Sequence, residues 1–251
     1  MPGPRESWRL ELAYDGTAFD GWARQPGRRT VEGELEAALA TVLREPVRLS
    51  VAGRTDAGVH ALAQVASFSS AAPVDPYRLR LALEAVLPDD IGVQAVTRAT
   101  DEFVARNAAL RTYRFRLWLA PTRPVHERAY VWALRGELDR AALQTMADLL
   151  VGHRDFAALT PSARLYHSCV RDVRSALWFD PPAGHSSELW FEVTAGSFLH
   201  NMVRVAVGSM VDVARGRMTA TQFAAALDSG ERRLMGQTAP ARGLALVAVD
   251  Y

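Results

Sequence analysis

The sequence predicts an α+β or α/β fold in which two similar halves each contribute a sheet. Three observations support this. Segments in which apolar residues alternate with period two are separated by segments with helical periodicity. The two parts of the chain carry similar sets of such segments, with no low-complexity tract or linker between them. Hydrophobic residues make up 49% of 251 residues, which is enough for a sizeable core. We therefore expect two sheets that meet edge to edge with a cleft between them, formed by residues 1–105 and 106–251.

In the first half, each expected element follows from the periodicity of its apolar residues. The strands are predicted at residues 8–14, 48–52, 61–68 and 91–98, and the helices at residues 30–43 and 75–86. The connection between residues 52 and 61 is short and rich in polar residues.

In the second half, strands are predicted at residues 111–119, 170–179, 188–194 and 244–249, and helices at residues 138–151, 198–215 and 219–228. Ser197 is a suitable N-cap for the helix at 198–215, and Gly216 is suited to end it. Pro181 to Gly184 predict a hairpin loop between two of the strands.

The composition says more about the cellular compartment of the protein than about the molecules that it binds. Cys169 is the one cysteine, so no intrachain disulfide can form, and a reducing compartment is expected. The N-terminal residues carry no apolar signal segment, and no apolar run of membrane-spanning length occurs, so we expect a soluble cytoplasmic protein. The net charge is only +1, and all 29 basic residues are arginine. Such a chain would bind nucleic acid well only with its arginines gathered on one face.

The segment from Gly53 to His60 (GRTDAGVH) carries the clearest chemical information. Gly53 and Gly58 can adopt backbone angles that other residues avoid, so Asp56 is expected in a tight connection at the edge of a sheet. Such a connection is a common place for a catalytic side chain. The alternative is an ordinary turn whose carboxylate caps local backbone amides.

The string GRTDAGVHALAQVASF resembles the signature of the TruA-type tRNA pseudouridine synthases. Further blocks resemble that family in the same order and extend the similarity over residues 8–251. They are Tyr14-Asp15-Gly16 with Phe19, Gly21-Trp22 and Gln25; residues 30–39; residues 87–91; Phe103 with Arg106; residues 111–115; Asp155-Phe156; residues 198–204; and residues 239–251.

The resemblance implies a pseudouridine synthase fold, with two related α/β halves around a central antiparallel sheet, and a homodimer. It implies that Asp56 is the catalytic residue, that Tyr113 stacks on the target base and serves as the general base, and that Arg204 pairs with Asp56. It also implies that Arg54 takes the place of the flipped-out nucleotide. His60 is either a contact to the RNA backbone or a structural histidine. From the helix pattern alone, Arg204 could equally form a structural ion pair or lie at the surface, and Tyr113 could be an ordinary strand residue.

The resemblance further implies that the substrate is a uridine on the 3′ side of the tRNA anticodon arm and that no cofactor is required, since the product is an isomer of the substrate. The scattered histidines and single cysteine predict no metal site, and motifs for nucleotide-binding loops or metalloproteases are missing. Two other functions stay open: an N-glycosidic hydrolase that uses the same aspartate, and a catalytically silent tRNA-binding protein.

Overall fold

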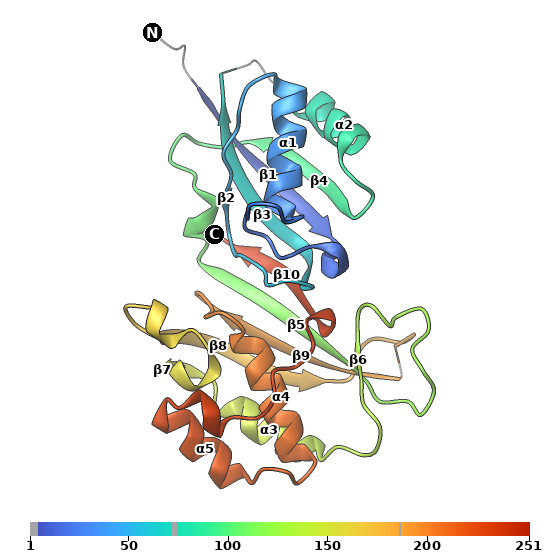
Figure 1. Ribbon diagram of the computed structural model, residues 1–251, viewed down its shortest axis with the longest axis vertical. Coiled ribbons are helices and arrows are strands. Elements are labelled where there is room, and N and C mark those ends of the chain that lie inside the picture. The colour runs from blue at the N-terminus through green and yellow to red at the C-terminus, as the bar shows by residue number, and fades with distance from the viewer. Residues whose placement is uncertain (1–4, 72–74, 186) are drawn as a thin grey trace. The chain divides into compact units, whose positions relative to one another are not determined.

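The computed structural model describes residues 5–71, 75–185 and 187–251 (Figure 1). The chain divides into two compact units, which we describe separately. The first comprises Met1–Arg111 together with Leu246–Tyr251, and the second comprises Thr112–Ala245. The first unit is therefore discontinuous in sequence, because its last strand comes from the end of the chain.

The first unit contains an antiparallel sheet with two helices. Its strands are β1 (Glu6–Tyr14), β2 (Ser50–Val51), β3 (His60–Ser70), β4 (Ile91–Arg98) and most of β10 (Leu244–Asp250). The strand order is β4-β1-β3-β10, and β2 pairs with β3. Helices α1 (Val31–Leu43) and α2 (Pro76–Val86) pack against each other, and α2 also packs against β4, as Figure 1 shows.

Local chemistry explains these elements. Along β1, every second residue from Trp8 to Tyr14 is buried, as a strand with one face in the core requires. The hydroxyl of Thr30 accepts a hydrogen bond from Gly33 N–H and caps α1. The Asp75 carboxylate does the same for α2, where proline occupies the first turn.

The second unit contains further strands and three helices. Its strands are most of β5 (Leu110–Trp118), β6 (Trp132–Ala133), β7 (Gly152–Asp155), β8 (Val170–Phe179) and β9 (Glu188–Ala195). The order is β5-β9-β8-β7, with β6 parallel to β5. Helices α3 (Arg140–Asp148), α4 (Met202–Ala214) and α5 (Ala220–Ser229) pack on one another (Figure 1), and α3 contacts β8. The side chains of Val205, Val207, Met210 and Val211 make α4 the most buried of the three.

The α+β prediction is confirmed, and most elements lie where periodicity predicted them. The loop at residues 181–184 joins β8 to β9, which pair antiparallel as expected of a hairpin. The strand expected at residues 48–52 is shorter, since only Ser50–Val51 pairs with β3. The short strands β6 and β7 were not expected. In the described part of the chain, no helix is long and apolar enough to cross a membrane.

Candidate active site

Asp56 lies in the loop that joins β2 to β3, at the edge of the first unit's sheet. The Asp56 carbonyl accepts a hydrogen bond of 3.1 Å from Val59 N–H, which closes a tight turn. Gly58 within this turn has a φ of 76°, a value that residues with a side chain rarely adopt. Gly53 is not among the described glycines with positive φ, so that part of the expectation was wrong. The Asp56 side chain is half-buried and Arg54 is exposed, so the loop presents both to its surroundings.

The segment that follows β1 packs directly on this loop. Trp22 N–H donates to the Thr55 carbonyl at 3.0 Å, and Gly58 N–H donates to the Phe19 carbonyl at 3.2 Å. At Gly16, an added Cβ atom would lie 2.0 Å from the Val59 carbonyl oxygen. The backbones are therefore in close contact, and two segments separated by about 40 residues in sequence form one rigid structure.

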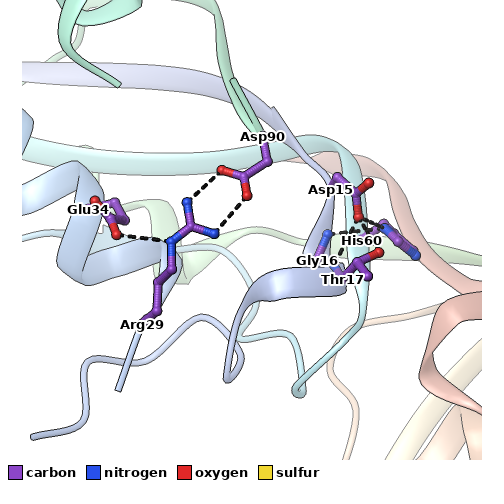
Figure 2. Close-up of polar contacts among 7 residues, drawn as sticks. All are labelled: Asp15, Gly16, Thr17, Arg29, Glu34, His60 and Asp90. Atoms are coloured by element: carbon purple, nitrogen blue, oxygen red, sulfur yellow. Dashed lines mark hydrogen bonds and ion pairs between the residues drawn. The ribbon is translucent and has the colours of Figure 1, made fainter. Parts of the chain in front are cut away.

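His60 is the first residue of β3 and is only 4% exposed. Its Nδ1 lies 3.1 Å from Gly16 N and 3.2 Å from Asp15 Oδ1 (Figure 2). Because a backbone N–H can only donate, Nδ1 accepts this bond and carries no proton for Asp15. This burial favours the structural role for His60; the RNA contact stays a prediction.

Arg29 fixes the other side of the same segment (Figure 2). Its guanidinium makes paired bonds of 2.7 and 2.9 Å to the Asp90 carboxylate, and its Nε donates to Glu34 at 3.2 Å. Hydrogen bonding to Asp90 raises the pKa of Arg29, so the ion pair persists at neutral pH. The guanidinium also lies 4.2 Å from the centre of the Phe19 ring. The start of β4 is thereby tied to the residues that hold the Asp56 loop.

Behind the loop, buried polar side chains hold its backbone from within the sheet. The hydroxyls of Tyr14 and Thr55 are 2.8 Å apart, and the Gln64 amide donates to Tyr14 Oη at 3.2 Å and to the Gly53 carbonyl at 2.7 Å. Burial raises the pKa of Tyr14 to about 12, so its hydroxyl stays protonated at physiological pH. Our sequence reasoning did not identify these residues. The available signal was Gln64 itself, a polar residue between the apolar segments Ala61–Ala63 and Val65–Ala66.

In the second unit, Tyr113 lies on β5 and is 7% exposed. The Phe198 ring meets it edge-on, with ring centres 5.0 Å apart. This contact orients the phenol without involving its hydroxyl. The neighbouring Arg114 and Arg116 lie on the opposite face of the strand, because side chains alternate along it.

Arg204 lies in the first turn of α4 and is half-buried. Its Nε donates to the Ala239 carbonyl at 2.8 Å, and its Nη1 donates to Asn201 Oδ1 at 2.6 Å. Asn201 is the N-cap, in the left-handed conformation with a φ of 61°. The helix therefore begins at Met202, and the expected start at Phe198 with a Ser197 cap was wrong. The pairing of Arg204 with Asp56 stays a prediction.

Two arginines of β5 in the second unit form ion pairs with glutamates of β9. Arg114 Nε donates to Glu192 at 2.7 Å, and Arg116 makes two bonds of 2.7 Å to the Glu188 carboxylate. Burial alone would raise the pKa of Glu188, but hydrogen bonds from Arg116, Trp190 and His185 outweigh it and lower that pKa. Among the described residues, no group of three His, Cys, Asp or Glu side chains could hold a metal ion.

Comparison with known proteins agrees with the family resemblance seen in the sequence motifs. A family model described as tRNA pseudouridine synthase matches residues 12–104 and 146–251. Asp56, Arg54, His60 and Arg204 lie in the matched ranges, and Tyr113 lies between them. The tRNA pseudouridine synthase A of Solidesulfovibrio magneticus is 44% identical and spans 97% of this chain and 90% of its own length. Its namesakes from Chloroflexus aurantiacus and Chlorobaculum tepidum are 42% and 36% identical, over 96% and 100% of this chain and 87% and 100% of their own.

Proposed function

This chain belongs to the tRNA pseudouridine synthase family and is an isomerase that converts uridine to pseudouridine in tRNA; we propose that Asp56 performs the attack, on uridines of the anticodon stem-loop. The single observation that carries the catalytic proposal is the rigid, half-buried loop that presents Asp56. A reacting carboxylate needs such fixed placement, because rate depends steeply on the geometry of attack.

The reaction can be written with all atoms conserved. The Asp56 carboxylate attacks C1′ of the ribose, and the bond from C1′ to N1 of uracil breaks with its electron pair on the base. The detached uracil turns so that C5 faces C1′. C5 then forms the new bond to C1′ and displaces Asp56. A base removes the proton from C5, and N1 takes up a proton, so no oxidant or reductant is needed.

We assign the proton transfer at C5 to Tyr113. Its ring is held by Phe198, which supports a stacking role against the uracil. Arg204 is assigned as the cation that keeps Asp56 ionised and aimed, as the family resemblance implies. The anchoring of Arg204 by Ala239 and Asn201 supports this role, because a positioned guanidinium loses little freedom when it binds a carboxylate.

We assign Arg54 the role of filling the space in the RNA helix that the target base leaves when it is flipped out. Its exposure, two residues before Asp56, supports this role. A planar guanidinium can stack where a base has been extruded. For His60, burial supports the structural role more than the RNA contact.

We also propose that the protein acts in the cytoplasm as a homodimer. The presence of tRNA there and the family resemblance support this. Light scattering of the purified protein tests the assembly, and a monomer at micromolar concentration would contradict it.

Asp56→Asn tests the central assignment, because the amide is nearly isosteric with the carboxylate but a poor nucleophile. The assay is release of tritium from tRNA labelled at uracil C5. We expect activity to be abolished, with melting temperature and tRNA affinity close to wild type. Asp101→Asn is the matched control, since Asp101 is exposed in a turn of the same unit. Turnover within tenfold of wild type in Asp56→Asn would refute the assignment.

The same reactions distinguish the other functions considered. A hydrolase would release free uracil in proportion to substrate consumed, whereas an isomerase releases none. A silent binding protein would release no tritium. The relatives bear the name of a synthase and support neither alternative.

A further inference from the structure

Gln64 is fully buried in β3, and each end of its amide group has a defined partner. Nε2 lies 2.7 Å from the Gly53 carbonyl and 3.2 Å from Tyr14 Oη, while Oε1 accepts from Val65 N–H at 3.2 Å. A carbonyl can only accept and a backbone N–H can only donate, so these partners fix the orientation of the amide. The Gln64 side chain therefore holds Gly53, three residues before Asp56, with a donor that points in one direction.

A second side chain holds the residue immediately before. The Arg111 guanidinium donates to the Ala52 carbonyl through Nε at 2.9 Å and Nη2 at 2.6 Å. Arg111 is itself only 7% exposed. Two consecutive carbonyls, those of Ala52 and Gly53, are thus bound by side chains rather than by strand neighbours. This arrangement fixes the backbone where it leaves β2.

The same network reaches the residue before Asp56. Tyr14 Oη binds the Thr55 hydroxyl at 2.8 Å, and the Thr55 carbonyl accepts from Trp22 N–H at 3.0 Å. Both ends of the Gly53–Thr55 segment are therefore tied to β1 and β3. Since the peptide planes here set the direction of the next Cα–Cβ bond, the network fixes the bond from which the Asp56 carboxylate extends.

We propose that Gln64, acting through Tyr14, Gly53 and Thr55, is a positioning residue for Asp56. The inference rests on the proposed role of Asp56 and adds to it the side chain that aims the carboxylate. Gln64 does not touch substrate in this scheme. Its contribution is to keep the loop in one backbone conformation, so that the attacking oxygen stays within reach of C1′.

Gln64→Glu is the sharpest test, because it keeps the size of the side chain and replaces the donor by an oxygen. At pH 8 that carboxylate repels the Gly53 carbonyl, and the loop must shift. We expect the single-turnover rate at saturating tRNA to fall by about 10- to 100-fold, with the tRNA Kd within about twofold of wild type. As pH falls toward 5, the introduced carboxyl takes up a proton and can donate to Gly53 again. The deficit relative to wild type should then shrink.

Gln94→Glu is the matched control. The Gln94 amide also donates to a backbone carbonyl, that of Leu62 at 3.1 Å, but it is exposed on β4. This variant should keep the wild-type rate at every pH. A merely structural role for Gln64 would lower the melting temperature without a pH-dependent deficit in the rate per folded molecule.

Tyr14→Phe is the second variant, and it tests the positioning role if Gln64→Glu does not fold. It removes one hydroxyl from the network, and we expect a rate about tenfold lower with unchanged Kd. A folded Gln64→Glu protein with the wild-type rate at pH 8 would overturn the proposal, as would a wild-type rate in Tyr14→Phe. Asp56→Asn measured in parallel separates the two claims: an inactive Asp56→Asn beside a fully active Gln64→Glu refutes only the positioning role.

Discussion

Gly16→Ala is expected to slow catalysis by displacing the Asp56 loop. The added Cβ would lie 2.0 Å from the Val59 carbonyl oxygen, and contacts below 3.0 Å essentially never occur at real Cβ atoms. Val59 must therefore move by about 1 Å, the difference between these distances. Its N–H is bonded to the Asp56 carbonyl, so the carboxylate moves too. A misplacement of this size at a reacting group costs about 100-fold in rate.

The assay is the single-turnover rate at saturating tRNA, measured beside the melting temperature. Overpacking of this kind costs about 1–3 kcal/mol, and each kcal/mol lowers the Tm of a chain of this length by about 2–4 °C. Gly92→Ala is the matched control, since a Cβ on Gly92 in β4 meets nothing within 4 Å. A Gly16→Ala protein with the wild-type rate would refute the claim that this contact determines the position of Asp56.

Three further predictions follow from the described contacts. Arg54→Ala is expected to lower the single-turnover rate about tenfold with little change in tRNA Kd, because base extrusion loses its support; a weaker Kd at an unchanged rate would make Arg54 a phosphate contact. Glu188→Gln should cost about 3 kcal/mol of unfolding free energy at pH 7, since it strands Arg116. The pKa of Glu188 is lowered in the fold, so the stabilising effect of this carboxylate is present above the unfolded pKa of about 4.3. The effect is lost as pH falls through the folded pKa. If chemical denaturation shows that Glu188→Gln loses as much unfolding free energy at pH 3 as at pH 7, this prediction is contradicted. Arg204→Met and Asp56→Ala should lower stability by less together than the sum of their separate effects, because partners do not contribute independently; strict additivity would count against their pairing.

Periodic elements were predictable from the sequence because their burial is periodic. In β1 and β5 every second side chain is buried, and this alternation is already visible in the residue types. The start of α4 was not predictable in the same way. Phe198 and Leu199 continue the apolar pattern, but Phe198 packs on Tyr113, and Asn201 turns into the left-handed region before the helix begins. Tertiary contacts there override the local pattern.

The short strands β6 and β7 lay beyond sequence reasoning for a related reason. Trp132–Ala133 is too short to show a period, and Gly152–Asp155 is mostly polar. Each exists because a partner strand supplies its hydrogen bonds, β5 in one case and β8 in the other. Non-local pairing of this kind leaves no trace in the segment itself.

The candidate site also combines a local sequence motif with contacts between residues far apart in the sequence. Asp56 stands out because it lies between two glycines, Gly53 and Gly58, in one continuous motif that also contains Arg54. The network behind it joins residues from β1, the loop and β3, up to 50 positions apart. Only the antiparallel pairing of β1 with β3 brings Tyr14 and Gln64 together. The sequence motif is therefore enough to propose Asp56 as the attacking group, whereas the side chains that hold its loop could not be predicted from the sequence.

The discontinuity of the first unit has a consequence for the order in which the chain is completed during synthesis. The second unit occupies one continuous stretch, Thr112–Ala245, and all of its strands and helices can assemble as soon as that stretch has left the ribosome. The first unit must wait for β10, although most of its residues are made first. Tyr251 then bonds to the Ala105 carbonyl at 2.9 Å and stacks near Phe103. The part of the molecule that bears Asp56 is thus begun first and finished last, and until then the edge of β3 that β10 will occupy stays open to other strands.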